Sequence, residues 1–163
     1  MNERQKKILA SLERSCARCE YSEKDVMAKA VRSLSKTGEV TDRDELAREA
    51  AEIVSALVSE LYVDNLRYAC AFAREKASLT GWGPAKIRLA LQAKGISGDH
   101  IKEALGEIDS ARASEKLLKL IVAKRRSLKG DPQIRLKLLR FGLGRGYGYD
   151  EVEKAVEESA QAI

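Results

Sequence analysis

The sequence predicts an all-α protein, built as an elongated, curved array of three tandem three-helix repeats. Two prolines and 5% aromatic residues in 163 positions leave a chain rich in Ala, Leu, Lys, Arg and Glu, which are good helix formers. Apolar residues recur with helical spacing along almost the whole chain, and no alternating apolar and polar run indicates a strand. The length fits one domain or a few small modules, which excludes a large multidomain enzyme.

Residues 1–62 are predicted to form the first repeat. One helix covers about residues 3–18, and a second begins after Ser22, whose hydroxyl is suited to cap the free N–H groups of a helix start. Residues 41–45 open a third helix, because their acidic side chains lie over the positive end of the helix dipole.

Residues 63–109 are predicted to form the second repeat. Asp64 is suited to cap a fourth helix that ends near Leu79. Pro84 fits the first position of a fifth helix, where its missing N–H would have no partner in any case. Gly95 resembles a glycine C-cap of that helix, and a sixth helix completes the unit.

Residues 110–163 are predicted to form the third repeat. A seventh helix covers about residues 113–128. Asp131 and Pro132 have the form of a cap followed by proline, so we expect them to start an eighth helix. The ninth helix is expected to begin at Asp150.

The second and third units share a pattern. Gly95-Ile96 recurs 51 positions later as Gly146-Tyr147, each time before a helix of similar apolar spacing. Small helical repeats stack side by side and bury each other's apolar faces, which leaves an elongated molecule. Such a shape offers surface for binding and no deep pocket.

Positive charge is concentrated in the third unit. The chain carries a net charge of +5, yet residues 110–149 hold 11 basic side chains against two acidic ones. Arg pairs well with phosphate and carboxylate, so a polyanion or an acidic protein surface is the partner that this patch favours. An ordinary solvated helix face stays the alternative, because charge alone does not distinguish the two. The predicted partner-binding residues are Lys86, Arg88, Lys94, Lys116, Lys119, Lys124, Arg125, Arg126, Lys129, Arg135, Lys137, Arg140 and Arg145.

Catalytic and metal-binding motifs are weak. His100 has no partner at a catalytic spacing, and Cys16-Ala17-Arg18-Cys19 lacks the second ligand pair of a zinc site and the preceding strand of a redox motif. Residues 142–146 lack the residue order of a phosphate loop. We therefore predict no catalytic residue, no metal site and no cofactor.

Three cysteines, no secretion signal and no apolar run long enough for a bilayer predict a monomeric cytoplasmic protein with free thiols and no membrane contact.

Spaced motifs occur in order along the chain. An acidic turn precedes an Arg-Tyr-Ala segment, a Trp-Gly pair opens a helix with Lys-Ile, and a Lys-Gly-Ile turn precedes another helix. They lie at residues 61–74, 81–87, 94–96, 101–105 and 140–147. This set resembles the RecX family of recombination regulators over roughly residues 9–158, most specifically in residues 62–105. Asn65 stands where the family has a second aspartate, and residues 36–44 are longer than the family's loop.

The resemblance implies a non-enzymatic inhibitor of the RecA recombinase. Its repeats would lie in the groove of the RecA filament on DNA, bridge neighbouring protomers, and restrain strand exchange and co-protease activity in DNA repair and the SOS response. The family motif gives structural roles to Asp64, Arg67, Trp82, Gly83, Gly95 and Gly146. Direct contact with single- or double-stranded DNA stays open.

Two other function classes remain as alternatives. A helical DNA-binding module or transcription regulator would also use a basic surface, although no helix stands out as a recognition helix. An enzyme would have to depend on Cys16, Cys19 or His100.

Overall fold

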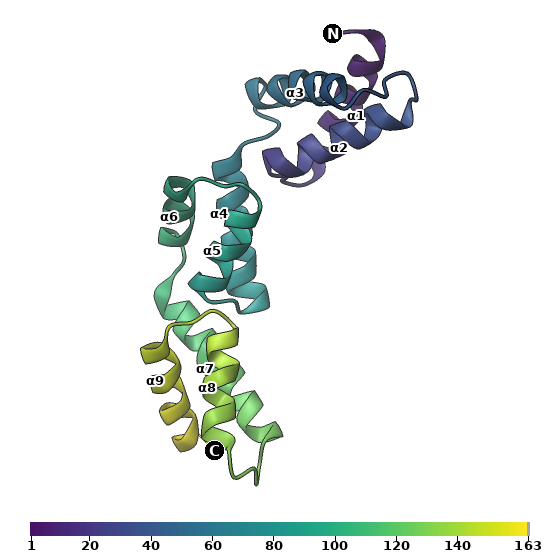
Figure 1. The fold of residues 1–163 in the computed structure, drawn as a ribbon. Helices are drawn as coiled ribbons and strands as arrows, with labels where there is room; N and C mark the ends of the chain where they lie inside the picture. The colour runs from purple at the N-terminus through teal and green to yellow at the C-terminus, as the bar shows by residue number, and fades with distance from the viewer. Residues whose placement is uncertain (163) are drawn as a thin grey trace.

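The computed structural model describes residues 1–162, and in this range the chain is helical with no strand (Figure 1). This confirms the predicted all-α class. The elements are α1 (Glu3–Arg18), α2 (Glu23–Lys36), α3 (Arg43–Ser59), α4 (Asn65–Glu75), the π-helix η1 (Lys76–Thr80), α5 (Pro84–Ala93), α6 (Gly98–Gly106), α7 (Ser110–Ser127), α8 (Ile134–Gly144) and α9 (Tyr149–Gln161).

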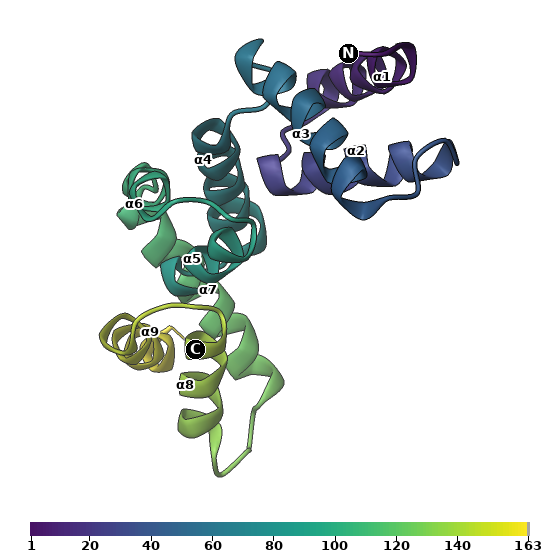
Figure 2. The ribbon, with the colours of Figure 1, turned by 45° about the horizontal axis from the view of Figure 1, so that its top comes forward.

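Three separate apolar cores follow one another along the molecule. The first is built around Leu34, Ile53 and Leu57, from α2 and α3, with α1 packed against them. The second is formed by α4, α5 and α6, and the third by α7, α8 and α9. Because each core belongs to three consecutive helices, the chain takes the elongated, curved shape seen in Figures 1 and 2. Independent domains with limits at residues 62 and 109 stay a prediction.

Side-chain caps begin most of the helices. Ser22 accepts from the backbone N–H of Asp25, and Asp64 accepts from that of Arg67, as the sequence predicts. Pro84 is the first residue of α5. Gly95 has a φ of +74°, which confirms the predicted left-handed C-cap.

The fourth helical segment ends at Thr80, close to the predicted end near Leu79, but its last five residues are the π-helix η1, in which Leu79 is 75% exposed. Two predicted helix starts were wrong. The seventh begins at Ser110, since Asp109 caps it by accepting from the N–H groups of Ala111 and Arg112.

The start of the eighth helix also differs from the prediction. Asp131 accepts from the backbone N–H of Gln133 and pairs with Lys137, so Asp131 and Pro132 form a turn outside the helix. α8 then starts at Ile134. A carboxylate that bonds two residues ahead makes an Asx turn, which mimics the sequence signature of a helix cap.

The second helices of neighbouring triplets meet at their ends, and we call α8, α5 and α2 the spine. The end of α8 meets the start of α5, where the N–H of Gly83 donates to the carbonyl of Arg145 and the N–H of Ala85 donates to that of Gly146, at 2.6 and 3.0 Å. The end of α5 meets the start of α2, where Lys24 Nζ donates to the carbonyl of Ala93 at 2.9 Å.

Candidate interaction surface

Four of the predicted patch residues form hydrogen bonds or ion pairs within the molecule away from the α8–α5 joint. Lys94 Nζ lies 3.0 Å from Asp25 at the α5–α2 joint, far along the spine from the third triplet, and this hydrogen bond raises the pKa of Lys94. Arg135 pairs with Glu153 at 3.6 Å. Lys137 pairs with Asp131, as described above.

Arg125 lies against α9 and points away from solvent. Its Nε donates to Ser159 Oγ at 2.9 Å, and its Nη2 donates to the carbonyl of Val156 at 3.1 Å. Hydrogen bonds from a charged donor to a neighbouring helix stabilise the α7–α9 packing. Arg125 therefore has a structural role and is not available to a partner.

Five patch residues are exposed and form no ion pair with any residue in 1–162. Lys119 and Arg126 are seven positions apart on α7, so they share the face opposite the buried Leu117 and Ile121. The full set is Arg88, Lys119, Arg126, Lys129 and Arg140, and we call it the outer set. These side chains are free to meet a partner.

A second group of cations gathers where α5 meets α8. Lys76 Nζ and Lys86 Nζ lie 4.8 and 4.7 Å from the ring centroid of Trp82. Lys124 Nζ and the Arg145 guanidinium lie 5.5 and 5.8 Å from the ring centroid of Phe141. With Lys116, which packs beside Gly81, these cations form what we call the joint cluster: Lys76, Lys86, Lys116, Lys124 and Arg145.

Glycines allow the two helix ends at this joint to touch. A Cβ on Gly83 would overlap the carbonyl group of Gly146, and a Cβ on Gly146 would lie 2.5 Å from Lys86 Cβ. Gly146 also has a φ of +97°, which other residues adopt only with strain. The two family-motif glycines thus place the cations of α5 beside those of α7 and α8.

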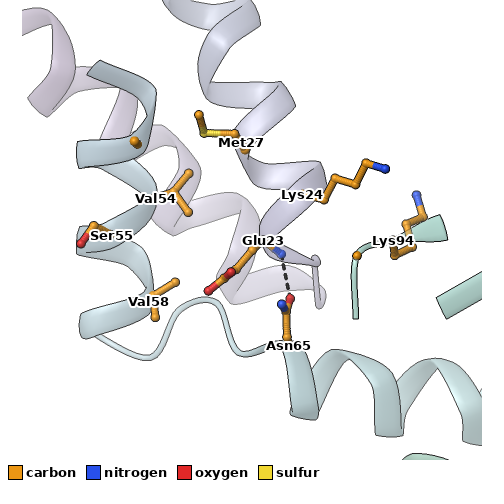
Figure 3. Close-up of a pocket in the computed structure, with 10 residues that line it drawn as sticks. Glu23, Lys24, Met27, Val54, Ser55, Val58, Asn65 and Lys94 are labelled. Carbon is orange, nitrogen blue, oxygen red and sulfur yellow. Dashed lines mark hydrogen bonds between the residues drawn. The ribbon is translucent and has the colours of Figure 1, made fainter. Parts of the chain in front are cut away.

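The boundary between the first and second triplets is held by side chains, including those of α4. Asn65 Oδ1 accepts from the N–H of Glu23 at 2.9 Å (Figure 3), and Arg67 Nε lies 2.7 Å from Glu20 Oε1. Arg67 Nη2 also donates to the carbonyls of Leu61 and Tyr62. This family-motif arginine therefore links the chain between α3 and α4 to the turn between α1 and α2, where Glu20 lies.

A hollow of about 550 Å³ opens beside these contacts. Met27, Val54 and Val58 form its apolar side, and Asn65 and Lys94 lie at its other edge (Figure 3). No acid, base or nucleophile converges on this hollow with a catalytic arrangement among its lining residues.

The remaining candidates for chemistry show no organised site in the described part of the chain. Burial raises the pKa of the Cys16 and Cys70 thiols, which makes both poor nucleophiles. His100 is at the first turn of α6, where its N–H donates to Ser97. No group of His, Cys, Asp or Glu in residues 1–162 could hold a metal ion. Across the same residues, no helix has the length and hydropathy to cross a membrane.

Lys76 is absent from the patch that the sequence predicts. The helical pattern of its segment does not indicate a contact with Trp82, whereas in the structure η1 brings Lys76 over the Trp82 ring. A cation six residues before the single tryptophan was the available signal, although spacing alone does not show that the two meet.

Known proteins share these features. A family model described as "RecX, second three-helix domain" matches residues 64–105. A "Regulatory protein RecX" of Clostridium botulinum (strain Alaska E43 / Type E3) is 33% identical over 136 residues, covering 78% of this chain and 63% of that protein. Another, of Clostridium botulinum (strain Eklund 17B / Type B), is 38% identical over 102 residues, covering 60% and 47%. The chain belongs to the RecX family.

Solved RecX structures have the same fold. The crystal structure of RecX from Lactobacillus salivarius covers 99% of this chain and 99% of its own length with a TM-score of 0.76 at 21% identity. Another, titled "Crystal structure of regulatory protein RecX", covers 96% and 72% with a TM-score of 0.77 at 20% identity. This RecX chain spans 47% and 63% of the length of the two curated relatives described above.

Proposed function

We propose that this RecX protein is a non-enzymatic regulator of the RecA recombinase. In this proposal it works as a monomer in the cytoplasm, lies in the groove of the RecA filament on DNA, bridges neighbouring RecA protomers and restrains recombination and co-protease activity. Family membership supports the RecA connection, and the elongated shape suits a partner that presents a long groove.

The outer set is the observation that carries the proposal. These five cations have no acidic partner in residues 1–162. They lie on α5, on α7 and the turn after it, and on α8. Clustered charge of one sign attracts a complementary surface and speeds association. Affinity for the filament should therefore fall as the salt concentration rises.

Co-sedimentation with RecA tests the proposal. We expect binding to RecA assembled on single-stranded DNA to exceed binding to the same DNA without RecA. Equal recovery with and without RecA would contradict the proposal. Sequence-dependent binding to duplex DNA would instead support a transcription regulator.

A charge-reversal triple variant locates the contact. Lys119→Glu, Arg126→Glu and Lys129→Glu change only outer-set residues, and Arg125 is left intact because it holds α9. The matched control reverses Lys7, Arg14 and Lys36, which are exposed on α1 and α2 and make the same change in net charge. We expect the first variant to lose filament binding and inhibition of the RecA ATPase, and the control to keep both. Equal loss in the two variants would show a general charge effect.

A further inference from the structure

The charges of the joint cluster, like those of the outer set, are not balanced by acidic side chains. Other cations of the protein do pair with nearby acids, as Lys94 does with Asp25 and Arg135 with Glu153. No member of the joint cluster forms an ion pair with an acidic side chain in residues 1–162, although its members come from η1, α5, α7 and the end of α8. Gathering like charges in one place costs free energy unless an anion joins them.

The fold holds these cations in place with aromatic rings. Lys76 and Lys86 both lie within 5 Å of the Trp82 centroid, and Trp82 itself stands edge-on to Phe72 at 6.2 Å. Phe141 supports Lys124 and Arg145 in the same way. Cation–π contacts fix the ammonium positions, so little side-chain entropy is left to lose when a ligand binds.

Arg145 connects the cluster to the rigid joint. Its guanidinium donates through Nη2 to the carbonyl of Thr80, and its Nε is buried with no acceptor among the described residues. Its own carbonyl accepts from Gly83, and the next carbonyl, of Gly146, accepts from Ala85. Backbone bonds thus set the distance between the cations of α5 and those of α7 and α8.

We infer that the joint cluster is a binding site for the phosphodiester backbone of single-stranded nucleic acid. A single strand carries a phosphate at every nucleotide, so one ligand can neutralise several of these cations and release the counterions held along the strand. An acidic peptide would have to place flexible carboxylates one by one. This inference rests on the proposed function. It adds a second partner, because the site would contact the nucleic acid in the filament as well as the RecA protein.

The geometry also predicts that the site does not distinguish between base sequences. Lys76 and Lys86 lie over Trp82, and Lys124 and Arg145 lie over Phe141, so the rings support cations and do not offer open faces for stacking bases. Recognition through phosphates carries no sequence information. Oligo(dT) and oligo(dA) of equal length should bind equally well.

The test uses the full chain without RecA. Fluorescence anisotropy of labelled oligo(dT) is measured across a salt series for the wild type, for Lys76→Gln with Lys86→Gln, and for Lys7→Gln with Lys36→Gln as a control of equal charge. On single strands, each phosphate contact contributes about −0.7 to the slope of log affinity against log salt. Loss of two contacts should therefore make the slope of the cluster variant less negative by about 1.4. The control should keep the wild-type slope.

A second variant separates binding from folding. Lys116→Gln with Lys124→Gln alters the α7 side of the cluster without touching the Gly146 contact of Lys86, and it should reduce the slope similarly. Trp82 is the only tryptophan, so its emission should also change when oligonucleotide binds the wild type. Unchanged slopes in both cluster variants, or displacement of oligo(dT) by polyglutamate at equal charge, would overturn the inference. Because RecA is absent, this result is independent of the co-sedimentation result.

Discussion

The backbone N–H of Gly83 donates to the carbonyl oxygen of Arg145 at 2.6 Å, across the boundary between the second and third helix triplets. At the other boundary the contacts use side chains: Lys24 of α2 donates to the carbonyl of Ala93 at the end of α5, and Asn65 of α4 accepts from the N–H of Glu23. A backbone joint fixes an angle more tightly than long side chains do, because fewer rotatable bonds separate the two bodies. The α8–α5 joint is therefore the stiffer of the two.

Gly83→Ala is expected to break the stiff joint. The added methyl would overlap the carbonyl group of Gly146, and backbone cannot move aside as a flexible side chain can. Overpacking of this kind costs about 1–3 kcal/mol, so the free energy of unfolding of the α4–α9 region should fall by that amount. Urea unfolding followed by circular dichroism measures it. Gly106→Ala has open space around its new methyl and serves as the control. Equal stability of the two variants would show that the contact is unimportant.

The sequence was sufficient for the helices and insufficient for their junctions. Ser22, Asp64 and Pro84 act on residues within one turn, so their roles can be read from local chemistry. The partners of Lys94 and Arg125 lie on other helices, at Asp25 and Ser159, and no local pattern reveals them. Sequence charge counting therefore placed both in the patch, although the fold uses them internally.

The same distinction explains the boundary errors. Asp131 was a sound cap by type and position, but its carboxylate bonds two residues ahead and toward Lys137, and that choice depends on the turn as a whole. The π-helix η1 likewise ends at the Gly81 turn, where a Cβ would lie 2.7 Å from Leu120 of α7, a neighbour from another triplet. Neither the Asp131 turn nor the π-helix follows from the periodicity of the apolar residues.

Asn65→Ala is expected to loosen the boundary between the first and second triplets, where α4 meets α2. The Glu23 N–H is at the start of α2, where no carbonyl within the helix can accept it, and Asn65 Oδ1 supplies the acceptor. A hydrogen bond of this kind contributes about 0.5–1.5 kcal/mol, so amide exchange at Glu23 should speed up by roughly three- to tenfold. Hydrogen exchange measured by NMR reports this directly.

Two comparisons make the exchange experiment specific. Asn65→Asp keeps an acceptor, as in the family pattern, and should exchange like the wild type. The Asp25 amide is bonded to Ser22 Oγ within the same helix turn and should be unaffected by either change. If Asn65→Ala left the Glu23 exchange rate unchanged, the side-chain link would not hold this boundary.

Asp131→Asn is expected to remove a pH-dependent part of the stability. The hydrogen bond from Lys137, and then that from the Gln133 N–H, lowers the pKa of Asp131 below its ordinary value of 3.8. A carboxyl with a lowered folded pKa stabilises the fold fully above its unfolded pKa, and this stabilisation is lost as the pH falls through the folded pKa. The variant should therefore melt below the wild type at pH 7.

Thermal melts across a pH series check this expectation. The difference in Tm between the wild type and Asp131→Asn should stay constant from neutral pH to mildly acidic pH. It should begin to shrink below about pH 3.8, where the carboxyl of the unfolded chain becomes protonated, and should approach zero as the pH falls through the lower pKa of the folded state. Glu157→Gln removes an exposed acid that has no ion pair in the described chain, and should show no such convergence. A Tm difference that is independent of pH would contradict the charge-based explanation.

Tyr147→Phe is expected to stabilise the third triplet. Tyr147 is 4% exposed in the core beside Leu138 and Val152, and its hydroxyl has no hydrogen-bond partner in the described residues. Burial raises the pKa of this phenol, so the group is neutral at every pH used, and its cost is that of an unsatisfied buried hydroxyl. Such a group costs about 1–3 kcal/mol. Urea unfolding should show the variant to be more stable by about 1 kcal/mol or more. Tyr149→Phe, at an exposed site, should change stability by less than about 0.5 kcal/mol. A loss of stability in Tyr147→Phe would mean that the hydroxyl is satisfied in solution.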